Sequence, residues 1–106
     1  MDRGALHVER SIALHAAVAA KLLAQPVLVE RARAKLRQWL AAGGRSSPLW
    51  RRWAEILDKP HDAVLAFLVE RSEEADWLRK ASPFAGILTP QERWRILRQT
   101  RAGTGA

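Results

Sequence analysis

The sequence predicts an all-α protein, folded as one compact domain of about five to six helices. Three observations point to that class: alanine, leucine, arginine and glutamate dominate, β-branched residues are sparse, and no segment alternates apolar and polar residues. A chain of 106 residues with 48% hydrophobic residues can build a core without disulfides. We therefore expect residues 1–106 to form a single helical domain, frayed over residues 1–8 and 101–106.

Two longer helices open the chain. Residues 9–24 place Leu14 and Val18 on one apolar face at helical spacing. A second helix over residues 26–42 begins with a proline, which is favoured in the first turn of a helix. Gly43 follows as the expected C-terminal cap.

Shorter helices follow, separated by prolines, serines and glycines. The clearest local signal is Thr89-Pro90-Gln91-Glu92, a capping box with proline at the first helical position. It predicts that the last helix begins at Pro90. The short helices are expected at about 48–58, 60–70, 73–81 and 90–100.

Composition excludes several classes of protein. The chain has no cysteine, which rules out disulfides, thiolate catalysis and thiolate metal sites. It has no run of about 18 apolar residues, so we expect no contact with a membrane. Its first residues, which soon reach Glu9 and Arg10, do not resemble a signal peptide. We therefore expect a cytoplasmic protein.

Positive charge is concentrated at the two ends of the chain. The net charge is +7. Residues 1–47 carry eight basic and three acidic groups, residues 48–89 carry six and seven, and residues 90–106 carry four and one. Fourteen of the eighteen basic residues are arginines, which pair well with carboxylates and phosphates. This distribution suggests an anionic partner, either nucleic acid or the acidic face of a protein, and a solvated arginine-rich surface is the alternative.

Four of the five tryptophans fall into two groups. Trp39 and Trp53 lie on apolar helix faces, so we expect both in the core. Trp50 and Trp94 stand beside arginines, a composition common in protein interfaces and in base-stacking platforms. A half-buried core position is the alternative for these two. The residues that we predict to bind a partner are Trp50, Arg51, Arg52, Phe84, Arg93, Trp94, Arg95 and Arg98.

Phe84 belongs to an apolar segment that cannot be helical. Residues 82–88 contain Pro83 and Gly86, both of which favour turns. Such a loop either folds over the core or docks into another protein, and the sequence leaves both outcomes open.

The second predicted helix carries an alternating basic run. Because residues two apart on a helix point about 200° apart, the run does not form one stripe. If its side chains met phosphates, binding would weaken steeply with salt. A solvated face is the other explanation. The nucleic-acid-binding candidates are Arg31, Arg33, Lys35 and Arg37.

Arg10 and His15 have a spacing, R-x4-H, that resembles the signature of a helical family of metal-independent ribonucleases. That resemblance implies an arginine that steadies a phosphate and a histidine that transfers a proton. However, His15 also falls within the apolar arc of its helix, where a hydrogen-bonded core histidine is the usual outcome. A ribonuclease is therefore a further alternative.

No other catalytic or metal-binding constellation stands out. Three scattered histidines without cysteine do not suggest a metal site. The serines lack a glycine-flanked elbow, and the chain has no phosphate-binding glycine loop. We expect a protein that is not an enzyme and that carries neither a metal nor another cofactor.

Two segments, ERSIALHAAVAAKL at 9–22 and SPFAGILTPQERW at 82–94, resemble small helical bacterial proteins. These are antitoxins of toxin–antitoxin pairs, particularly those beside nucleotidyltransferase toxins. The resemblance covers nearly the whole chain. It implies a non-enzymatic protein that neutralises a co-encoded toxin by direct contact. Binding to DNA as an autoregulator is the alternative, and the sequence leaves open whether the chain forms a homodimer.

Overall fold

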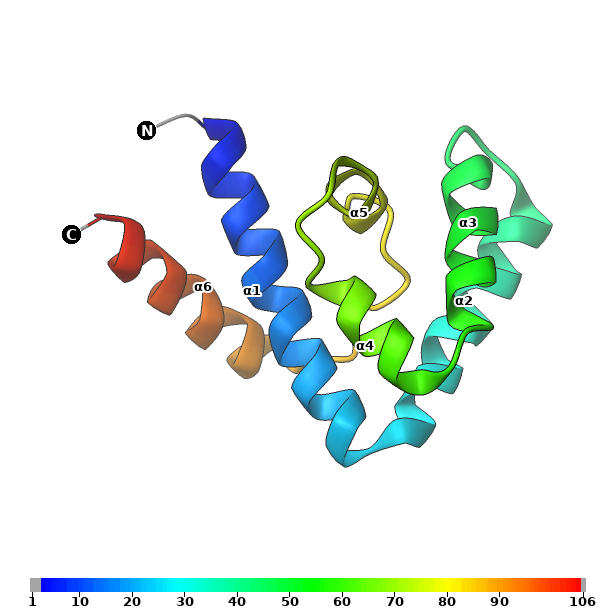
Figure 1. Cartoon of the computed structure of the whole chain (residues 1–106), viewed down its shortest axis with the longest axis horizontal. Helices are drawn as coiled ribbons and strands as arrows, with labels where there is room; N and C mark the ends of the chain where they lie inside the picture. Colours follow the sequence, from blue (N-terminus) through cyan, green and yellow to red (C-terminus); the bar gives the residue numbers. More distant parts are fainter. Residues whose placement is uncertain (1–2, 106) are drawn as a thin grey trace.

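The structure, a computed structural model, describes the backbone of residues 3–105 and the side chains of residues 6–101 (Figure 1). Within that part, all regular structure is helical. The α-helices are α1 (Arg3–Ala24), α2 (Val29–Ala42), α3 (Ser47–Leu57), α4 (His61–Leu68), α5 (Glu73–Arg79) and α6 (Pro90–Gly105), and a 3₁₀ turn, η1 (Pro26–Leu28), precedes α2. The predicted all-α class with about six helices is confirmed.

Both terminal helices extend beyond their predicted limits. α1 begins at Arg3 instead of near residue 9, and α6 reaches Gly105 instead of residue 100. Helical backbone therefore covers most of the two end segments that the sequence predicts to fray, while residues 1–2 and 106 lie outside the described residues. At 16 residues, α6 is longer than α2, which has 14.

Local signals in the sequence correctly mark the ends of two helices. Gly43 has a positive φ of 77°, and its N–H donates to the carbonyl of Trp39 at 2.9 Å, which ends α2. The capping box before α6 is complete. The backbone N–H of Glu92 donates to the Thr89 hydroxyl at 3.1 Å, and the Thr89 N–H donates to the Glu92 carboxylate at 2.7 Å.

The core is built around Trp53, whose side chain is fully buried. Its indole N–H donates to the carbonyl of Leu78 at 2.8 Å. The rings of Phe67 and Phe84 pack near its edges, with centroid separations of 5.4 and 5.7 Å. These contacts join α3 to α4, α5 and the loop before α6. The side chains that fill the core beside it include Leu22, Ile56, Leu57, Val64, Leu68 and Leu78.

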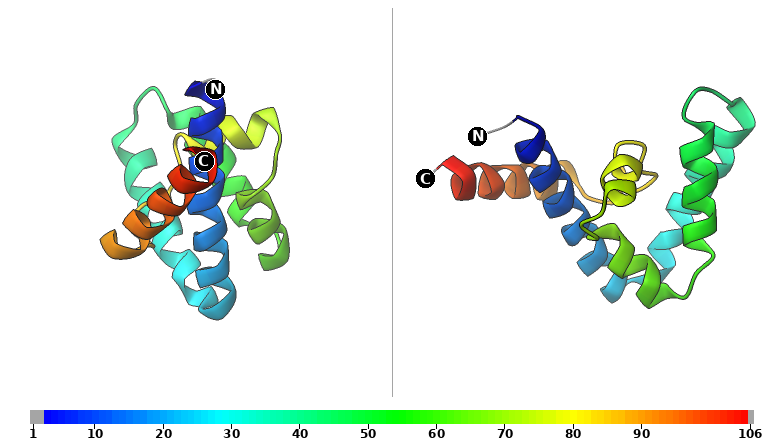
Figure 2. Two further views of the ribbon diagram at one scale, coloured as in Figure 1. Left: turned by 90° about the vertical axis from the view of Figure 1, so that its left-hand side faces the viewer. Right: turned by 45° about the horizontal axis from the view of Figure 1, so that its top comes forward.

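The helices form a V-shaped molecule (Figures 1 and 2). α1 and α6 cross to make one arm, and the antiparallel pair α2 and α3 makes the other. α4 lies against α1, and α5 lies between the arms. The principal extents are 43 × 31 × 24 Å. Consequently α3 and α6 lie at opposite ends of the molecule.

The apolar loop 82–88 folds over the core. Phe84 is only 2% exposed, and Ile87 is also buried. Gly86 supplies a positive φ of 93°, and the neighbouring carbonyl of Ala85 accepts a hydrogen bond from Lys35 of α2. Because its ring is enclosed in the core, Phe84 cannot reach a partner in the folded chain. The structure thus corrects the prediction that Phe84 binds one.

Replacing Trp53 tests the central role of its indole. Trp53→Phe leaves a void and removes the donor to the Leu78 carbonyl, so we expect the free energy of unfolding to fall by about 2–4 kcal/mol. Urea denaturation followed by circular dichroism measures the change.

Trp77→Phe is the matched control, because Trp77 is 58% exposed. We expect that substitution to change stability by less than about 0.5 kcal/mol. Equal effects at the two positions would contradict the placement of Trp53 at the centre of the core.

Candidate functional site

α6 is anchored to α1 at its first turn. The Lys21 ammonium donates to the Glu92 carboxylate at 2.8 Å and to the carbonyl of Ile87 at 2.9 Å. The hydrogen bond from Lys21, followed by that from the Thr89 backbone, lowers the pKa of Glu92 to about 2. The carboxylate is therefore ionised at neutral pH, and a charged contact holds the start of α6 in place.

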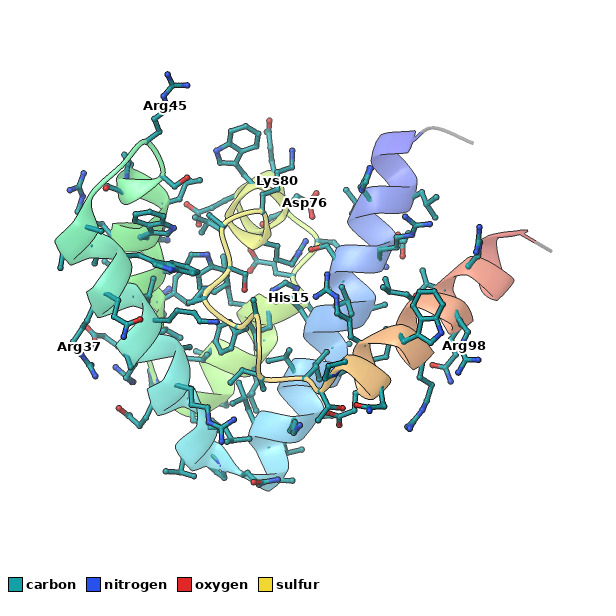
Figure 3. All side chains as sticks on the ribbon, turned by 180° about the vertical axis from the view of Figure 1, so that it is seen from behind. His15, Arg37, Arg45, Asp76, Lys80 and Arg98 are labelled. Atoms are coloured by element: carbon teal, nitrogen blue, oxygen red, sulfur yellow. The ribbon has the colours of Figure 1, made fainter. Side chains whose placement is uncertain are left out.

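The two faces of α6 differ in exposure. Ile96 and Leu97 are half-buried on the side toward α1, whereas the opposite face is open to solvent. Trp94 is 61% exposed there, one helical turn before Arg98. Arg95 adjoins both on the same side of the helix. Figure 3 shows Arg98 projecting away from the body of the protein. We call Trp94, Arg95 and Arg98 the α6 face.

Three arginines in the first half of α6 lack acidic partners. Arg93, Arg95 and Arg98 make no ion pair with any described residue. Four arginines elsewhere in the described chain pair with carboxylates, whereas Arg31, Arg37, Arg45 and Arg51 are exposed and make no ion pair. The pairs are Arg33 with Glu30 and Asp58, Arg52 with Glu55 and Glu74, Arg71 with Glu9, and Arg79 with Asp76. The α6 face thus combines an exposed indole with unpaired positive charge.

The second predicted partner-binding cluster, which consists of Trp50, Arg51 and Arg52 in α3, is less exposed than the α6 face. Trp50 is half-buried and packs against Trp39 with a centroid separation of 5.3 Å. Arg52 bridges Glu55 at 2.9 Å and Glu74 at 3.2 Å. Only Arg51 of this cluster is exposed. Since α3 lies at the opposite end of the molecule from α6, the structure does not bring the two clusters together.

The basic run of α2 is divided between solvent and internal contacts. Arg33 contacts Asp58 and the carbonyl of Leu57, and Lys35 donates to the loop before α6. Arg31 and Arg37 remain exposed. The run therefore presents no continuous surface to a phosphate backbone, which weakens the nucleic-acid alternative.

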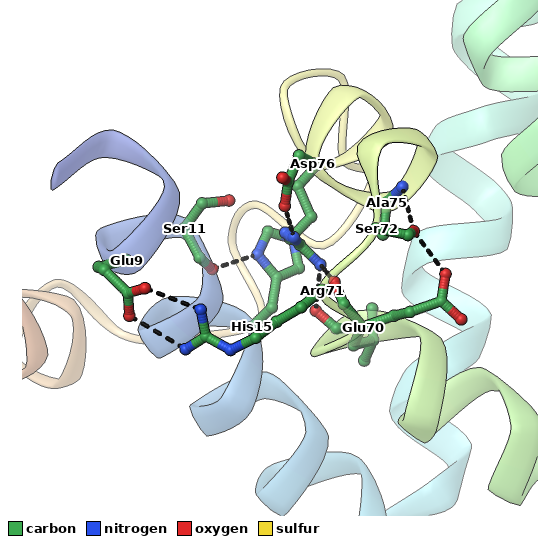
Figure 4. A network of polar contacts seen from close by, with 10 residues as sticks. Glu9, Ser11, His15, Glu70, Arg71, Ser72, Ala75 and Asp76 are labelled. Atoms are coloured by element: carbon green, nitrogen blue, oxygen red, sulfur yellow. Dashed lines mark hydrogen bonds and ion pairs between the residues drawn. The ribbon is translucent and has the colours of Figure 1, made fainter. Parts of the chain in front are cut away.

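A cavity of about 500 Å³ lies between α1, α6 and the segment from Arg79 to Leu88. Arg10 and His15, the residues of the R-x4-H spacing, both line it. His15 is buried, and both of its ring nitrogens are engaged: Nδ1 lies 2.7 Å from the Ser11 carbonyl and Nε2 lies 2.8 Å from the Ser82 hydroxyl. Figure 4 shows the contact with Ser11.

Burial lowers the pKa of His15 to about 4, and the nearby Arg79 charge acts in the same direction. The imidazole is therefore neutral at physiological pH. A proton-transferring histidine needs a nitrogen within reach of its substrate, whereas these two nitrogens bind the protein itself. The geometry fits the core-histidine interpretation better than the ribonuclease alternative.

Sequence reasoning missed three polar features of this region. Arg79 is buried, with a side-chain exposure of 1%. It donates to the carbonyl of Leu68, the last residue of α4, and to that of Glu70, which follows α4. Arg71 forms a bidentate pair with Glu9 of α1 (Figure 4). The ammonium of Lys80 lies 4.6 Å from the ring centre of Trp77. No local pattern could have revealed the contacts of Arg71 with Glu9 or of Arg79 with the two carbonyls, because these partners are set by the fold. The spacing of Trp77 and Lys80, three residues apart at the end of α5, is a local signal for their contact.

The described part of the chain contains neither a metal-binding cluster nor a membrane-spanning helix. No group of three or more histidine, aspartate or glutamate side chains is placed to hold a metal ion. No described helix is both long enough and apolar enough to cross a membrane.

The neutral state of His15 predicts a pH-dependent stability. Between pH 6.5 and about 4 the unfolded chain protonates this histidine before the folded chain does, so stability falls as the pH is lowered. The loss attributable to His15 is about 3 kcal/mol. Urea denaturation of the wild type and His15→Gln should show a stability difference at pH 7 that shrinks toward pH 4.

His7→Gln is the control, because His7 is exposed. Its difference from the wild type should remain small at every pH in this range. A His15→Gln difference that does not change with pH would contradict a buried, neutral imidazole.

No protein-family model, curated protein or solved structure matches the chain. The likeness to antitoxins therefore stays an expectation from residues 9–22 and 82–94. The function has to be inferred from the placement of the chain's own residues, among which the α6 face is the most exposed combination of aromatic surface and unpaired charge.

Proposed function

We propose that the chain is a non-enzymatic binding protein that neutralises a co-encoded bacterial toxin, of the nucleotidyltransferase type, by direct contact through the α6 face. The observation that carries the proposal is the exposed indole of Trp94 beside Arg95 and Arg98, which have no acidic partner among the described residues.

Trp94 would act as the apolar anchor of the interface. Tryptophan and arginine are the residues most enriched where interfaces derive their binding energy. Burying a large exposed ring against a partner gains the free energy of removing apolar surface from water. Since α6 is already held on α1 through Lys21 and Glu92, this helix does not have to be ordered on binding.

Arg95 and Arg98 would provide charge complementarity. An unpaired guanidinium can form bidentate hydrogen bonds with a carboxylate without first breaking an internal pair. An enzyme that binds nucleotides together with a metal ion commonly has acidic groups at its active site. A cationic helix placed against that site would block access to it, and the opposite charges would speed association.

Complex formation tests the proposal. The chain should co-purify with the product of the neighbouring toxin gene after co-expression and elute with it in size-exclusion chromatography. Trp94→Ala should weaken the complex by about 30-fold or more, measured by calorimetry, because it removes the buried anchor. The same variant should lose its ability to restore growth to cells that express the toxin.

Trp77→Ala and Arg37→Ala are matched controls for Trp94→Ala and Arg98→Ala. Trp77 is exposed on α5, and Arg37 lies on the arm away from α6 (Figure 3). Both controls should bind as the wild type does. Absence of a complex, or equal weakening by the control and α6 variants, would overturn the proposal. Retardation of DNA at low salt without a protein complex would favour the nucleic-acid alternative.

A further inference from the structure

The cavity beneath α6 has the dimensions of a small-molecule site. Its volume of about 500 Å³ falls in the range found for pockets that enclose small ligands. Its walls come from α1, from α6 and from the segment between α5 and α6. These elements are fixed by Lys21 on one side and by the buried Phe84 on the other, so the cavity is a built feature of the fold.

The lining of the cavity is strongly cationic. Arg10, Arg79, Lys80 and Arg93 contribute to it, and no aspartate or glutamate does. Arg79 pairs with Asp76, and the Lys80 ammonium lies over Trp77. Arg10 and Arg93 have no such partner among the described residues. The two charges face the cavity from α1 and α6, and nothing else in the described chain neutralises them.

Arg10 also carries an unsatisfied donor. Its Nε is buried and has no hydrogen-bond partner in the described chain. A second such atom, Nε of Arg79, belongs to a side chain with 1% exposure that also lines the cavity. Leaving a buried donor unpaired costs about 1–3 kcal/mol, and more for a charged group. The Arg10 guanidinium belongs to a side chain that lines the cavity, where an anion would compensate its charge.

Part of the remaining wall is apolar, which indicates more than a bare anion. Leu14, Val18 and Leu97 are among the residues that line the cavity, together with Phe84. A phosphate ion would leave much of this volume empty. An organic group attached to the phosphate would cover the apolar wall and be withdrawn from water. The neutral His15 adds no positive charge but closes one side through its hydrogen bond to Ser82.

We propose that this cavity binds a small organic phosphate. The phosphoryl group lies between Arg10 of α1 and Arg93 of α6. The organic group lies against the apolar side chains of Leu14, Val18 and Leu97. A dianionic phosphate matches two guanidinium groups better than a single carboxylate does. The proposal does not require the protein partner of the α6 face, because the cavity is formed by the chain alone.

Calorimetry on the full chain, at about 50 mM salt, tests the site with AMP, adenosine and inorganic phosphate as probes. We expect AMP to bind with a Kd of about 1 mM or tighter. Adenosine lacks the charge and inorganic phosphate lacks the organic group, so each should bind at least about tenfold more weakly than AMP. Inorganic phosphate binding as tightly as AMP would contradict the role of the apolar wall.

Arg10→Met and Arg93→Met remove the two charges and keep much of the apolar length. Each should weaken AMP binding by about tenfold or more, while circular dichroism shows the helical content of the wild type. Arg45→Met is the matched control, because Arg45 projects from the loop before α3, far from the cavity (Figure 3). It should bind AMP as the wild type does.

Either of two results overturns the proposal. One is that neither AMP nor inorganic phosphate binds at concentrations up to about 10 mM. The other is that binding is equally strong in Arg10→Met, Arg93→Met and Arg45→Met, which would indicate nonspecific attraction to a chain of net charge +7. Because two different side chains are replaced, failure of one variant to fold leaves the other as a test.

Discussion

The burial of the Trp53 indole is the contact on which the rest of the fold depends. α4 and α5 have only eight and seven residues, too few to form stable helices alone. Both are held by tertiary contacts, and Trp53 meets a side chain or a carbonyl from each: the ring of Phe67 in α4 and the carbonyl of Leu78 in α5. The same indole packs against Phe84, so it also determines where the loop before α6 crosses the core.

That loop in turn places α6. Phe84 and Ile87 are buried, and the carbonyl of Ile87 accepts a hydrogen bond from Lys21 of α1. Lys21 then reaches Glu92, the residue that completes the capping box of α6. A polar anchor at one end and a modest apolar face along the helix are enough to hold α6 on α1. The opposite face, with Trp94, is left without a partner in the described chain.

The arginines serve two different purposes. Those such as Arg52 and Arg79 connect helices through carboxylates or free carbonyls, and their charge is compensated inside the chain. Others make no ion pair within the described residues, among them Arg93, Arg95 and Arg98 of α6, Arg10 of α1, and the exposed Arg31, Arg37, Arg45 and Arg51. What distinguishes α6 is that its unpaired Arg95 and Arg98 lie beside the exposed indole of Trp94. The α6 face and the cavity beneath it share a single helix, so a ligand in the cavity lies next to the proposed protein interface.

The sequence by itself determined the helical class, the capping of α2 and α6, and the presence of an aromatic and cationic segment near the C-terminus. These properties are local: a cap needs residues three positions apart, as in Thr89 and Glu92, and periodicity needs one or two turns. Only the tertiary structure decided that Phe84 is buried while Trp94 is exposed, and that Arg10 lines a cavity. Exposure and charge compensation depend on partners far away in the chain, which no local pattern of residues encodes.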